Sequence, residues 1–310
     1  MLALVLLAVA ARAEAPPPAW AFPVPPPGFK AAPDDGALRH VPDSAVRLTV
    51  SQVRDYFSAP DWHPEAHPPM PEVVARGRRP DLYACGFCHR AEGTGGPENS
   101  DLAGLPAAYI VRQLRDYRSG ARTSTLPERL PQKLMIALSK QVTDAEAEAA
   151  AAYFSSLRPR QRIRVVESET APRTAPGGWH LVAALTGERE PIGSRIVEVP
   201  EDAERFENRD PRARFVAYVP PGSLARGEAL VATGAGKTVR CATCHGPELK
   251  GVGATPSIVG RSPSYVVRQL VDFQGGARAG PLAAQMKPTV ARLDPDDLVA
   301  IAAYLASRAP

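Results

Sequence analysis

Two short stretches of the chain, CGFCH and CATCH, place two cysteines and a histidine at the same spacing. The first comprises Cys85, Cys88 and His89, and the second begins at Cys241. Cysteines three residues apart suit three kinds of chemistry: a redox dithiol, half of a zinc site, or covalent attachment of haem. A single copy of so short a motif leaves all three open, so the rest of the sequence has to distinguish them.

The chain contains an internal repeat that includes both motifs. An offset of 156 residues superimposes the two C-x-x-C-H units and lays AAYIVRQLRDYRSGAR over PSYVVRQLVDFQGGAR. Farther along, the offset becomes 151 residues, aligns TDAEAEAAAAYFSSL with PDDLVAIAAYLASR, and places Met135 on Met286. Two copies of one unit indicate two similar domains.

The repeat favours haem over the two other chemistries. A zinc site needs four ligands in one cluster, whereas the two cysteine pairs lie in separate repeats. A thioredoxin-like dithiol needs a strand–helix context, whereas both motifs lie in helix-prone surroundings. On a helical turn, the two cysteines can bond to the two vinyl groups of one porphyrin while the histidine reaches the iron. The residues predicted to hold two covalently bound haem c groups are Cys85, Cys88 and His89 in the first repeat and Cys241, Cys244 and His245 in the second.

The composition is that of a globular protein long enough for two domains. Of the 310 residues 44% are hydrophobic, and 34 prolines indicate long stretches outside helices and central strands. The formal net charge is +4, from 37 basic and 33 acidic side chains that are scattered along the chain. Because no basic run stands out, nucleic-acid binding is not predicted.

The first residues, MLALVLLAVAARAEAPPP, have the pattern of a secretory signal peptide. An apolar run is followed by small-residue cleavage sites near residues 13 and 15, although a positively charged first region is missing. The run is too short to span a bilayer, and no later segment approaches its length, so no transmembrane anchor is expected. The sequence therefore predicts export to the periplasm as a soluble protein.

The chain resembles the two-haem c-type cytochromes that are built from tandem class I cytochrome c domains. The resemblance rests on the two C-x-x-C-H motifs, the two Y-x-V-R-Q-L segments, the G-A-R elements and the late methionine before an A-A-Y helix. It implies a mainly α fold, with two tandem class I cytochrome c-like helical domains joined by a bridge with short β-strands. The expected parts are a signal peptide over residues 1–15, a Pro-rich N-terminal arm over 16–70, cytochrome c domain 1 over 71–160, the inter-domain bridge over 161–220 and cytochrome c domain 2 over 221–310.

The resemblance also implies axial and second-sphere residues for each haem. Met135 and Met286 are the expected sixth iron ligands, because they occupy equivalent places in the repeat. Without the repeat, each methionine would be interpreted as a residue that packs in the hydrophobic core. The family places a proline carbonyl next to the ligand histidine, a role that Pro256 fills in the second repeat and Ser100 in the first. Arginines that could pair with haem propionates, or else form a solvated face, are Arg112, Arg122, Arg268 and Arg278.

Each repeat ends in a helix with clear sequence signals. Thr143 and Glu146 form a capping box before the first of these helices, and Asp294 is the expected cap of the second. Leu298, Ile301, Ala302 and Leu305 make the apolar stripe of that second helix. By resemblance, the helix crosses the one that bears the haem motif, with Tyr153 or Tyr304 near the crossing.

Two segments lie outside the repeats. Residues 16–33 contain eight prolines and favour an extended arm on the surface or on a partner. In the following loop, His63, His67 and Met70 could bind copper, but the surrounding prolines favour an irregular loop packed on a domain. The bridge contains IRVVESE, SRIVEVPE and RFVAYVPP, which predict short strands. His180 lies within the bridge and is expected to be structural.

The resemblance implies a periplasmic di-haem electron carrier. With both axial positions filled, each haem would cycle between Fe(III) and Fe(II) with no open position for a substrate. The expected partners are periplasmic redox proteins, namely a dehydrogenase or the respiratory chain on one side and a terminal oxidase or reductase on the other. Two alternatives stay open: a two-haem cytochrome c peroxidase-like enzyme, and a dedicated cytochrome subunit of a periplasmic dehydrogenase complex that docks through its proline-rich arm.

Overall fold

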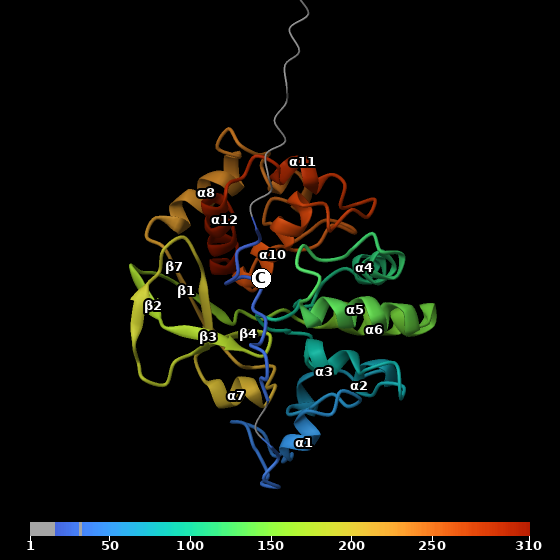
Figure 1. The fold of residues 1–310 in the computed structure, drawn as a ribbon. Helices are drawn as coiled ribbons and strands as arrows, with labels where there is room; N and C mark the ends of the chain where they lie inside the picture. The colour runs from blue at the N-terminus through green and yellow to red at the C-terminus, as the bar shows by residue number, and fades with distance from the viewer. Residues whose placement is uncertain (1–15, 31–32) are drawn as a thin grey trace, which may run out of the picture.

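The computed structural model describes residues 16–30 and 33–310, and two helical units dominate it (Figure 1). The first unit contains α2 (Glu72–Ala75), α3 (Cys85–His89), α4 (Ala107–Ser119), α5 (Leu130–Gln141) and α6 (Asp144–Ser156). The second contains α8 (Ser223–Thr233), α9 (Ala242–His245), α10 (Pro263–Gln274), α11 (Met286–Val290) and α12 (Pro295–Ser307). The expectation of two tandem helical domains is confirmed.

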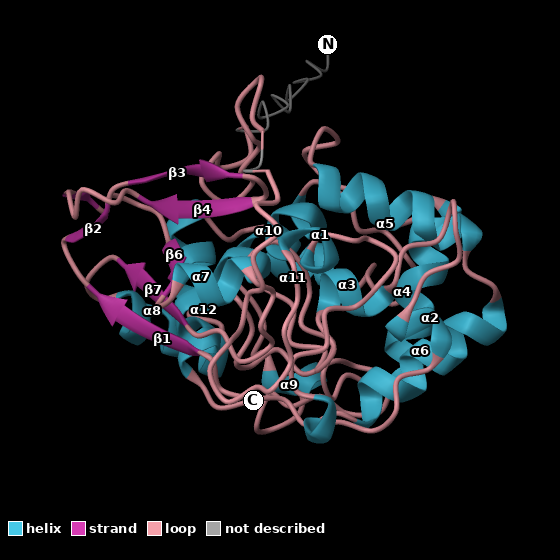
Figure 2. Ribbon diagram, turned by 90° about the horizontal axis from the view of Figure 1, so that it is seen from below, coloured by secondary structure: helices cyan, strands magenta, loops and turns pink. Residues whose placement is uncertain are grey.

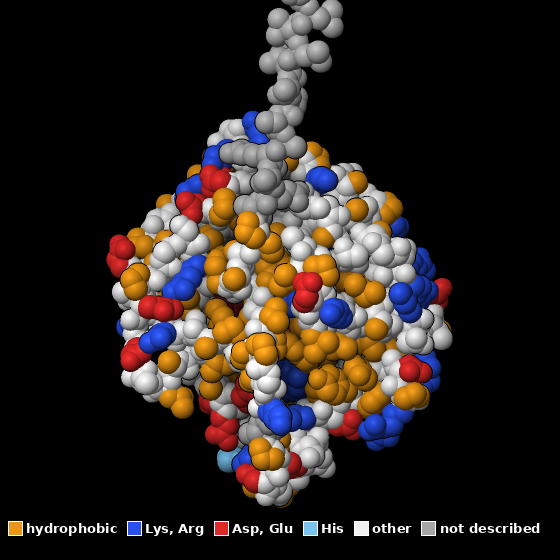
Figure 3. Space-filling view, in the orientation of Figure 1, with side chains coloured by type: hydrophobic (Ala, Val, Ile, Leu, Met, Phe, Trp, Pro, Cys, Tyr) orange, Lys and Arg blue, Asp and Glu red, His pale blue; other side chains and the backbone are white. Residues whose placement is uncertain are grey.

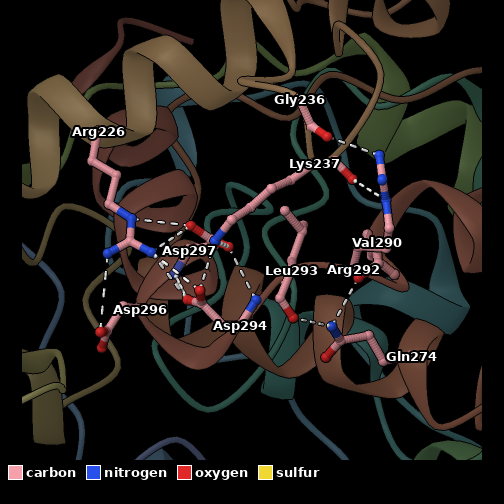
Figure 4. A network of polar contacts seen from close by, with 10 residues as sticks. All are labelled: Arg226, Gly236, Lys237, Gln274, Val290, Arg292, Leu293, Asp294, Asp296 and Asp297. Carbon is pink, nitrogen blue, oxygen red and sulfur yellow. Dashed lines mark hydrogen bonds and ion pairs between the residues drawn. The ribbon is translucent and has the colours of Figure 1, made fainter.

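Helix α12 is the central helix of the second domain. Asp294 caps it in a capping box with Asp297, and the predicted apolar stripe of the helix is buried. Arg226 and Lys237 hold these two carboxylates in place (Figure 4), with contacts of 2.6 Å from Arg226 Nη2 to Asp297 Oδ1 and 2.7 Å from Lys237 Nζ to Asp294 Oδ2. The cap and its cations thereby fix where the helix begins.

The main helix partner of α12 is α8, which directly precedes the haem motif, and not the motif helix α9 itself. The last helix was expected to cross the helix that bears the haem motif, and its main contact is instead with the helix before that motif. The reason is steric, since Gly227 of α8 lets the two backbones approach closely beside Ala300 and Tyr304. The motif is consequently positioned through the turn that joins α8 to α9.

We expect replacement of Gly227 by valine to destabilise the second domain by about 2 kcal/mol. A Cβ atom at Gly227 would lie 2.1 Å from the carbonyl oxygen of Ala300, so α8 and α12 would have to separate. Replacement of Ala232, an exposed residue of the same helix, by valine is the matched control. Denaturant unfolding measures both variants, and equal stabilities would contradict the close helix contact.

Helix α6 has the corresponding role in the first domain. Thr143 and Glu146 form the predicted capping box, and α6 packs against α4 and α2. Tyr153 of α6 donates its hydroxyl hydrogen to the carbonyl oxygen of Ala91 over 2.8 Å. Because Ala91 follows the motif helix α3, this bond ties α6 to the first haem motif.

The inter-domain segment folds into short strands, three of which were predicted. β1 (Ile163–Glu167), β7 (Phe215–Val219) and β6 (Val197–Pro200) form a sheet in that order, with β1 parallel and β6 antiparallel to β7. The other elements of the segment are β2 (Thr170–Pro172) paired with β5 (Arg189–Pro191), β3 (Thr174–Gly177) paired with β4 (His180–Ala183), and α7 (Ala203–Glu207).

The sheet belongs to the core of the second domain. Figure 2 shows the strands beside α8 and α12, with α2, α4, α5 and α6 on the other side of the molecule. Ile163, Ile196 and Phe215 of the segment share one apolar core with Leu298 of α12. The inter-domain segment is therefore an extension of the second domain as well as a connection. The residue boundaries expected for the arm, the two domains and the bridge stay a prediction.

The N-terminal arm packs on the chain itself. Ala21 and Phe22 are buried in the core of the second domain. The expectation that this part of the arm lies on the surface is therefore wrong. Farther along, the arm forms α1 (Val50–Val53) and the single turn η1 (Pro64–Ala66). Trp62 is buried, and its indole donates to the carbonyl oxygen of Asn208 over 2.6 Å.

The loop after Trp62 is irregular and packed on the protein, as predicted. His63 is buried with its Nε2 3.2 Å from Asp210, and His67 lies 3.2 Å from Asp61. No cluster of three His, Cys, Asp or Glu side chains suited to a metal ion occurs among residues 16–30 and 33–310. His180 is also in a structural setting, with its ring 4.6 Å from that of Phe206.

Within the described part of the chain, no helix is long and apolar enough to cross a membrane. The signal peptide expected over residues 1–15 lies outside the described residues.

Candidate haem sites

The first haem motif lies in the wall of a large cavity in the first domain. Cys85, Cys88 and His89 line this cavity from α3, and Met135 lines it from α5. The cavity measures about 1250 Å³, the solvent at its mouth included. Hydrophobic side chains gather between α3 and α5 on the face shown in Figure 3, as expected for helices that border an apolar cavity.

The second motif lines a cavity of the same kind. Cys241, Cys244 and His245 come from the α9 region, and Met286 comes from the start of α11. This cavity measures about 1780 Å³, again with the solvent at its mouth. In both domains the structure thus brings together the motif and the methionine that the repeat pairs with it.

Each motif histidine is oriented by a backbone carbonyl. His89 Nδ1 lies 2.8 Å from the carbonyl oxygen of Ser100, and His245 Nδ1 lies 2.8 Å from that of Pro256. A carbonyl oxygen only accepts, so Nδ1 carries the hydrogen and Nε2 keeps its lone pair for a metal. Burial lowers the pKa of both histidines, which favours the neutral ligand form. Ser100 therefore replaces the family's proline without loss of this bond.

The first cysteine of each motif is a poor nucleophile in its surroundings. Burial raises the pKa of the Cys85 thiol to about 12 and that of Cys241 to about 11. A reactive dithiol requires a lowered thiol pKa, because the thiolate is the nucleophile. Burial of Cys85 and Cys241 therefore disfavours the redox-dithiol interpretation of the motif.

The two G-A-R elements of the repeat meet at the boundary between the domains. Arg122 and Arg278 form an antiparallel backbone bridge. Each guanidinium donates to both domains: Arg122 to Gln113 (2.8 Å) and Gln269 (2.9 Å), and Arg278 to Gln269 (3.1 Å) and Gln113 (2.9 Å). Because these pairs are equivalent in the repeat, the interface has approximate two-fold symmetry.

Arg122 and Arg278 are buried cations that suit an anionic ligand. Each is 7% exposed, and neither forms an ion pair with a described residue, while Nε of Arg278 has no acceptor there. A buried charge is stable when it is paired. Since Arg122 lines the first cavity and Arg278 the second, the residues present fit a group with carboxylates, as haem has in its propionates.

The other two candidate arginines have different surroundings. Arg268 is 1% exposed and donates to the carbonyl oxygens of Ala21 (2.7 Å) and Pro97. It lies outside the lining of both cavities and connects the arm to the first haem loop, while its contact with a propionate stays a prediction. Arg112 is half-buried on α4 and also lies outside both linings.

The inter-domain segment contributes a lining residue to the first cavity that was not predicted from the sequence. Trp179, at the turn between β3 and β4, lines the first cavity, and its carbonyl oxygen accepts a hydrogen bond of 3.1 Å from Arg129. The lining of the second cavity includes no residue of the inter-domain segment. Trp179 lies outside the repeat, so no internal copy signalled its role.

Comparison with known proteins gives a family match over both helical domains. The family model of cytochrome c matches residues 74–158 and 224–309. A thiosulfate dehydrogenase electron acceptor of Thiomonas intermedia (strain K12) is 27% identical over 232 residues, covering 74% of this chain and 80% of its own length. Cytochrome c4 of Azotobacter vinelandii is 26% identical over 227 residues, covering 71% of this chain and 82% of its own.

The two family matches span more than half of the chain, which therefore belongs to the cytochrome c family and contains two of its domains. It carries two covalently bound haem c groups and is a di-haem electron-transfer protein. The resemblance to two-haem c-type cytochromes, which rested on the repeated motifs, is confirmed.

Proposed function

We propose that the chain is a periplasmic electron carrier in which each haem is held by the residues that the repeat brings together. The observation that carries this proposal is the same in both domains: a C-x-x-C-H motif and a methionine from a separate helix line one cavity. The proposed thioether residues are Cys85, Cys88, Cys241 and Cys244, and the proposed iron ligands are His89, Met135, His245 and Met286.

The bound haems would supply two one-electron Fe(III)/Fe(II) couples. A histidine and a methionine would ligate each iron, a ligand pair that raises the reduction potential. The carbonyl groups of Ser100 and Pro256 keep the imidazoles in the ligand tautomer. The apolar linings would limit the access of water to each bound haem, so these residues favour outer-sphere electron transfer over binding of a substrate.

The two cavities adjoin each other at the domain boundary, which supports electron exchange within the molecule. Ser100, Tyr109, Gln113 and Tyr265 line both cavities. Burial would raise the pKa of the Tyr265 hydroxyl, but Arg122 and Arg278 lower it below the usual value. The boundary is therefore positively charged, as the site of haem carboxylates should be.

The relatives favour a dehydrogenase as the electron donor. One of them is named a thiosulfate dehydrogenase electron acceptor, and we propose that this chain likewise receives electrons from a periplasmic dehydrogenase and delivers them to the respiratory chain. Whether it is a permanent subunit of such a dehydrogenase is tested by co-purification. A stoichiometric dehydrogenase in the purified material would favour the subunit over the mobile carrier.

Reductive titration of the purified holoprotein tests the carrier function. We expect the uptake of two electrons per chain, full return of both to an oxidant, and no turnover of hydrogen peroxide. Catalytic consumption of peroxide by the reduced protein would contradict the carrier function and favour a peroxidase-like enzyme.

We expect replacement of Trp179 by alanine to lower the reduction potential of the first haem by roughly 60 mV, which corresponds to about 1.4 kcal/mol for one electron. Removing the indole opens the first cavity to water, and water stabilises the more highly charged ferric state. Replacement of Trp20, which lines neither cavity, is the control. Spectroelectrochemistry measures both haems, and an equal shift at the second haem would contradict a local role for Trp179.

A further inference from the structure

The outer surface of the first haem motif is covered by the chain itself. Phe87, inside the motif, is 1% exposed, and its ring lies 4.6 Å from that of Tyr56 in the arm. Arg209 from the inter-domain segment stacks 3.9 Å from the Phe87 ring and donates to the Phe87 carbonyl oxygen over 2.9 Å. Gly86 abuts Ala59 of the arm so closely that a Cβ atom at Gly86 would lie 2.8 Å from it.

The equivalent surface of the second motif is open. Thr243, which corresponds to Phe87 in the repeat, is exposed, and so is Cys244. The same contrast holds on both sides of the motif. Arg240 and Lys250 are exposed, whereas the residues at the equivalent positions of the first repeat, Ala84 and Thr94, are each 1% exposed.

The open surface combines apolar side chains with positive charge. Val239, Val252 and Leu282 are 54%, 60% and 54% exposed. Val239 and Leu282 line the second cavity together with Arg240, so these side chains lie at its mouth. Lys250 adds a second cation, and the nearby carboxylate of Glu248 lies 3.9 Å from it. We call this surface, formed by Val239, Arg240, Cys244, Lys250, Val252 and Leu282, the second-domain face.

We propose that the second-domain face is the docking surface for a one-electron redox protein with an acidic contact surface, while the equivalent face of the first domain is occupied by the arm and the inter-domain segment. An apolar centre with a charged rim is the usual build of a transient interface, and complementary charge speeds the encounter. Each encounter exchanges one electron, so the partner is oxidised when this chain is reduced. The proposal rests on the proposed carrier function and assigns its partner surface.

Charge reversal tests the proposal with a defined anionic probe. In stopped flow at low ionic strength, hexacyanoferrate(III) oxidises the reduced holoprotein, and we expect the Arg240→Glu/Lys250→Glu variant to react about tenfold more slowly than the native protein. The matched control is Lys133→Glu/Lys140→Glu on α5, since both lysines are exposed on the first domain. The control should react within twofold of the native rate, and the tenfold difference should vanish at high salt.

The native protein provides a second measurement that needs no variant. Paramagnetic hexacyanochromate(III), added to the reduced holoprotein, should broaden the NMR signals of the Val239, Val252 and Leu282 methyl groups. Broadening of Leu130 on α5 in their place would overturn the assignment of the docking surface. Equal slowing of the two charge-reversal variants, or slowing that salt does not remove, would overturn it as well.

The haem content and two-electron uptake of every sample separate this proposal from the carrier function. If the samples take up two electrons and only the predicted rates fail, the docking surface is wrong and the carrier function stands. If two-electron uptake itself fails in the native protein, the proposed function fails and the docking proposal falls with it.

Discussion

Replacement of Met286 by alanine is expected to open the sixth coordination position of the second haem and to leave the first haem unchanged. The sulfur-to-iron absorption band should fall to half its intensity, and the reduced variant should bind one carbon monoxide per chain. The potential of the second haem should fall by roughly 0.2 V, a fraction of the range of about 0.8 V that axial ligands set. Met135→Ala should have the same effects on the first haem.

Met70 supplies the control for both variants. It packs against the core of the first domain but lines neither cavity, so Met70→Ala should keep the full absorption band and bind no carbon monoxide. If Met135→Ala or Met286→Ala also kept the full band, the corresponding methionine would not be a ligand.

Replacement of Arg278 by leucine is expected to weaken the domain interface and to lower the potentials of both haems. The change removes the hydrogen bonds from a buried cation to Gln269 and Gln113, and each of these amide oxygens then keeps only its bond from Arg122. Hydrogen bonds to charged groups contribute about 1.5–3 kcal/mol each, so the stability should fall by roughly 3 kcal/mol. Loss of a buried positive charge favours the ferric state, which lowers the potentials.

The conservative variant separates charge from geometry. Arg278→Lys keeps the charge but loses the planar fork that reaches both domains. Its reduction potentials should therefore be close to native, while its stability should remain near that of Arg278→Leu. Arg112→Ala on α4 is the control, and its reduction potentials and stability should both remain native. A fall in potential at the second haem alone would contradict the shared interface, because Arg278 donates to residues of both domains.

The haem motifs and the helix starts could be predicted from the sequence because short-range chemistry determines them. Covalent attachment requires the cysteines and the histidine at fixed spacing, and the capping boxes at Thr143 and Asp294 depend on residues three positions away. The placement of Met135 and Met286 at the cavities required the repeat, since each methionine is far along the chain from its motif.

The contacts that depend on remote segments could not be predicted. Arg268 lies in a repeated helix, but its acceptors are carbonyl groups of Ala21 and Pro97, which no sequence pattern connects with it. The pairing of Arg122 with Arg278 required knowledge that the two repeats face each other. Trp179 has no repeated counterpart, and Phe22 in the proline-rich arm gave no sign that it enters the core of the second domain.

Optical spectra of the purified native protein, with haem quantified per chain and carbon monoxide added to the reduced form, test whether both haems are closed electron-transfer sites. We expect two haems per chain, the sulfur-to-iron band in the oxidised protein at the intensity of two methionine ligands, and no binding of carbon monoxide. Binding of carbon monoxide to either haem, or a single haem per chain, would contradict a carrier with two closed haem sites.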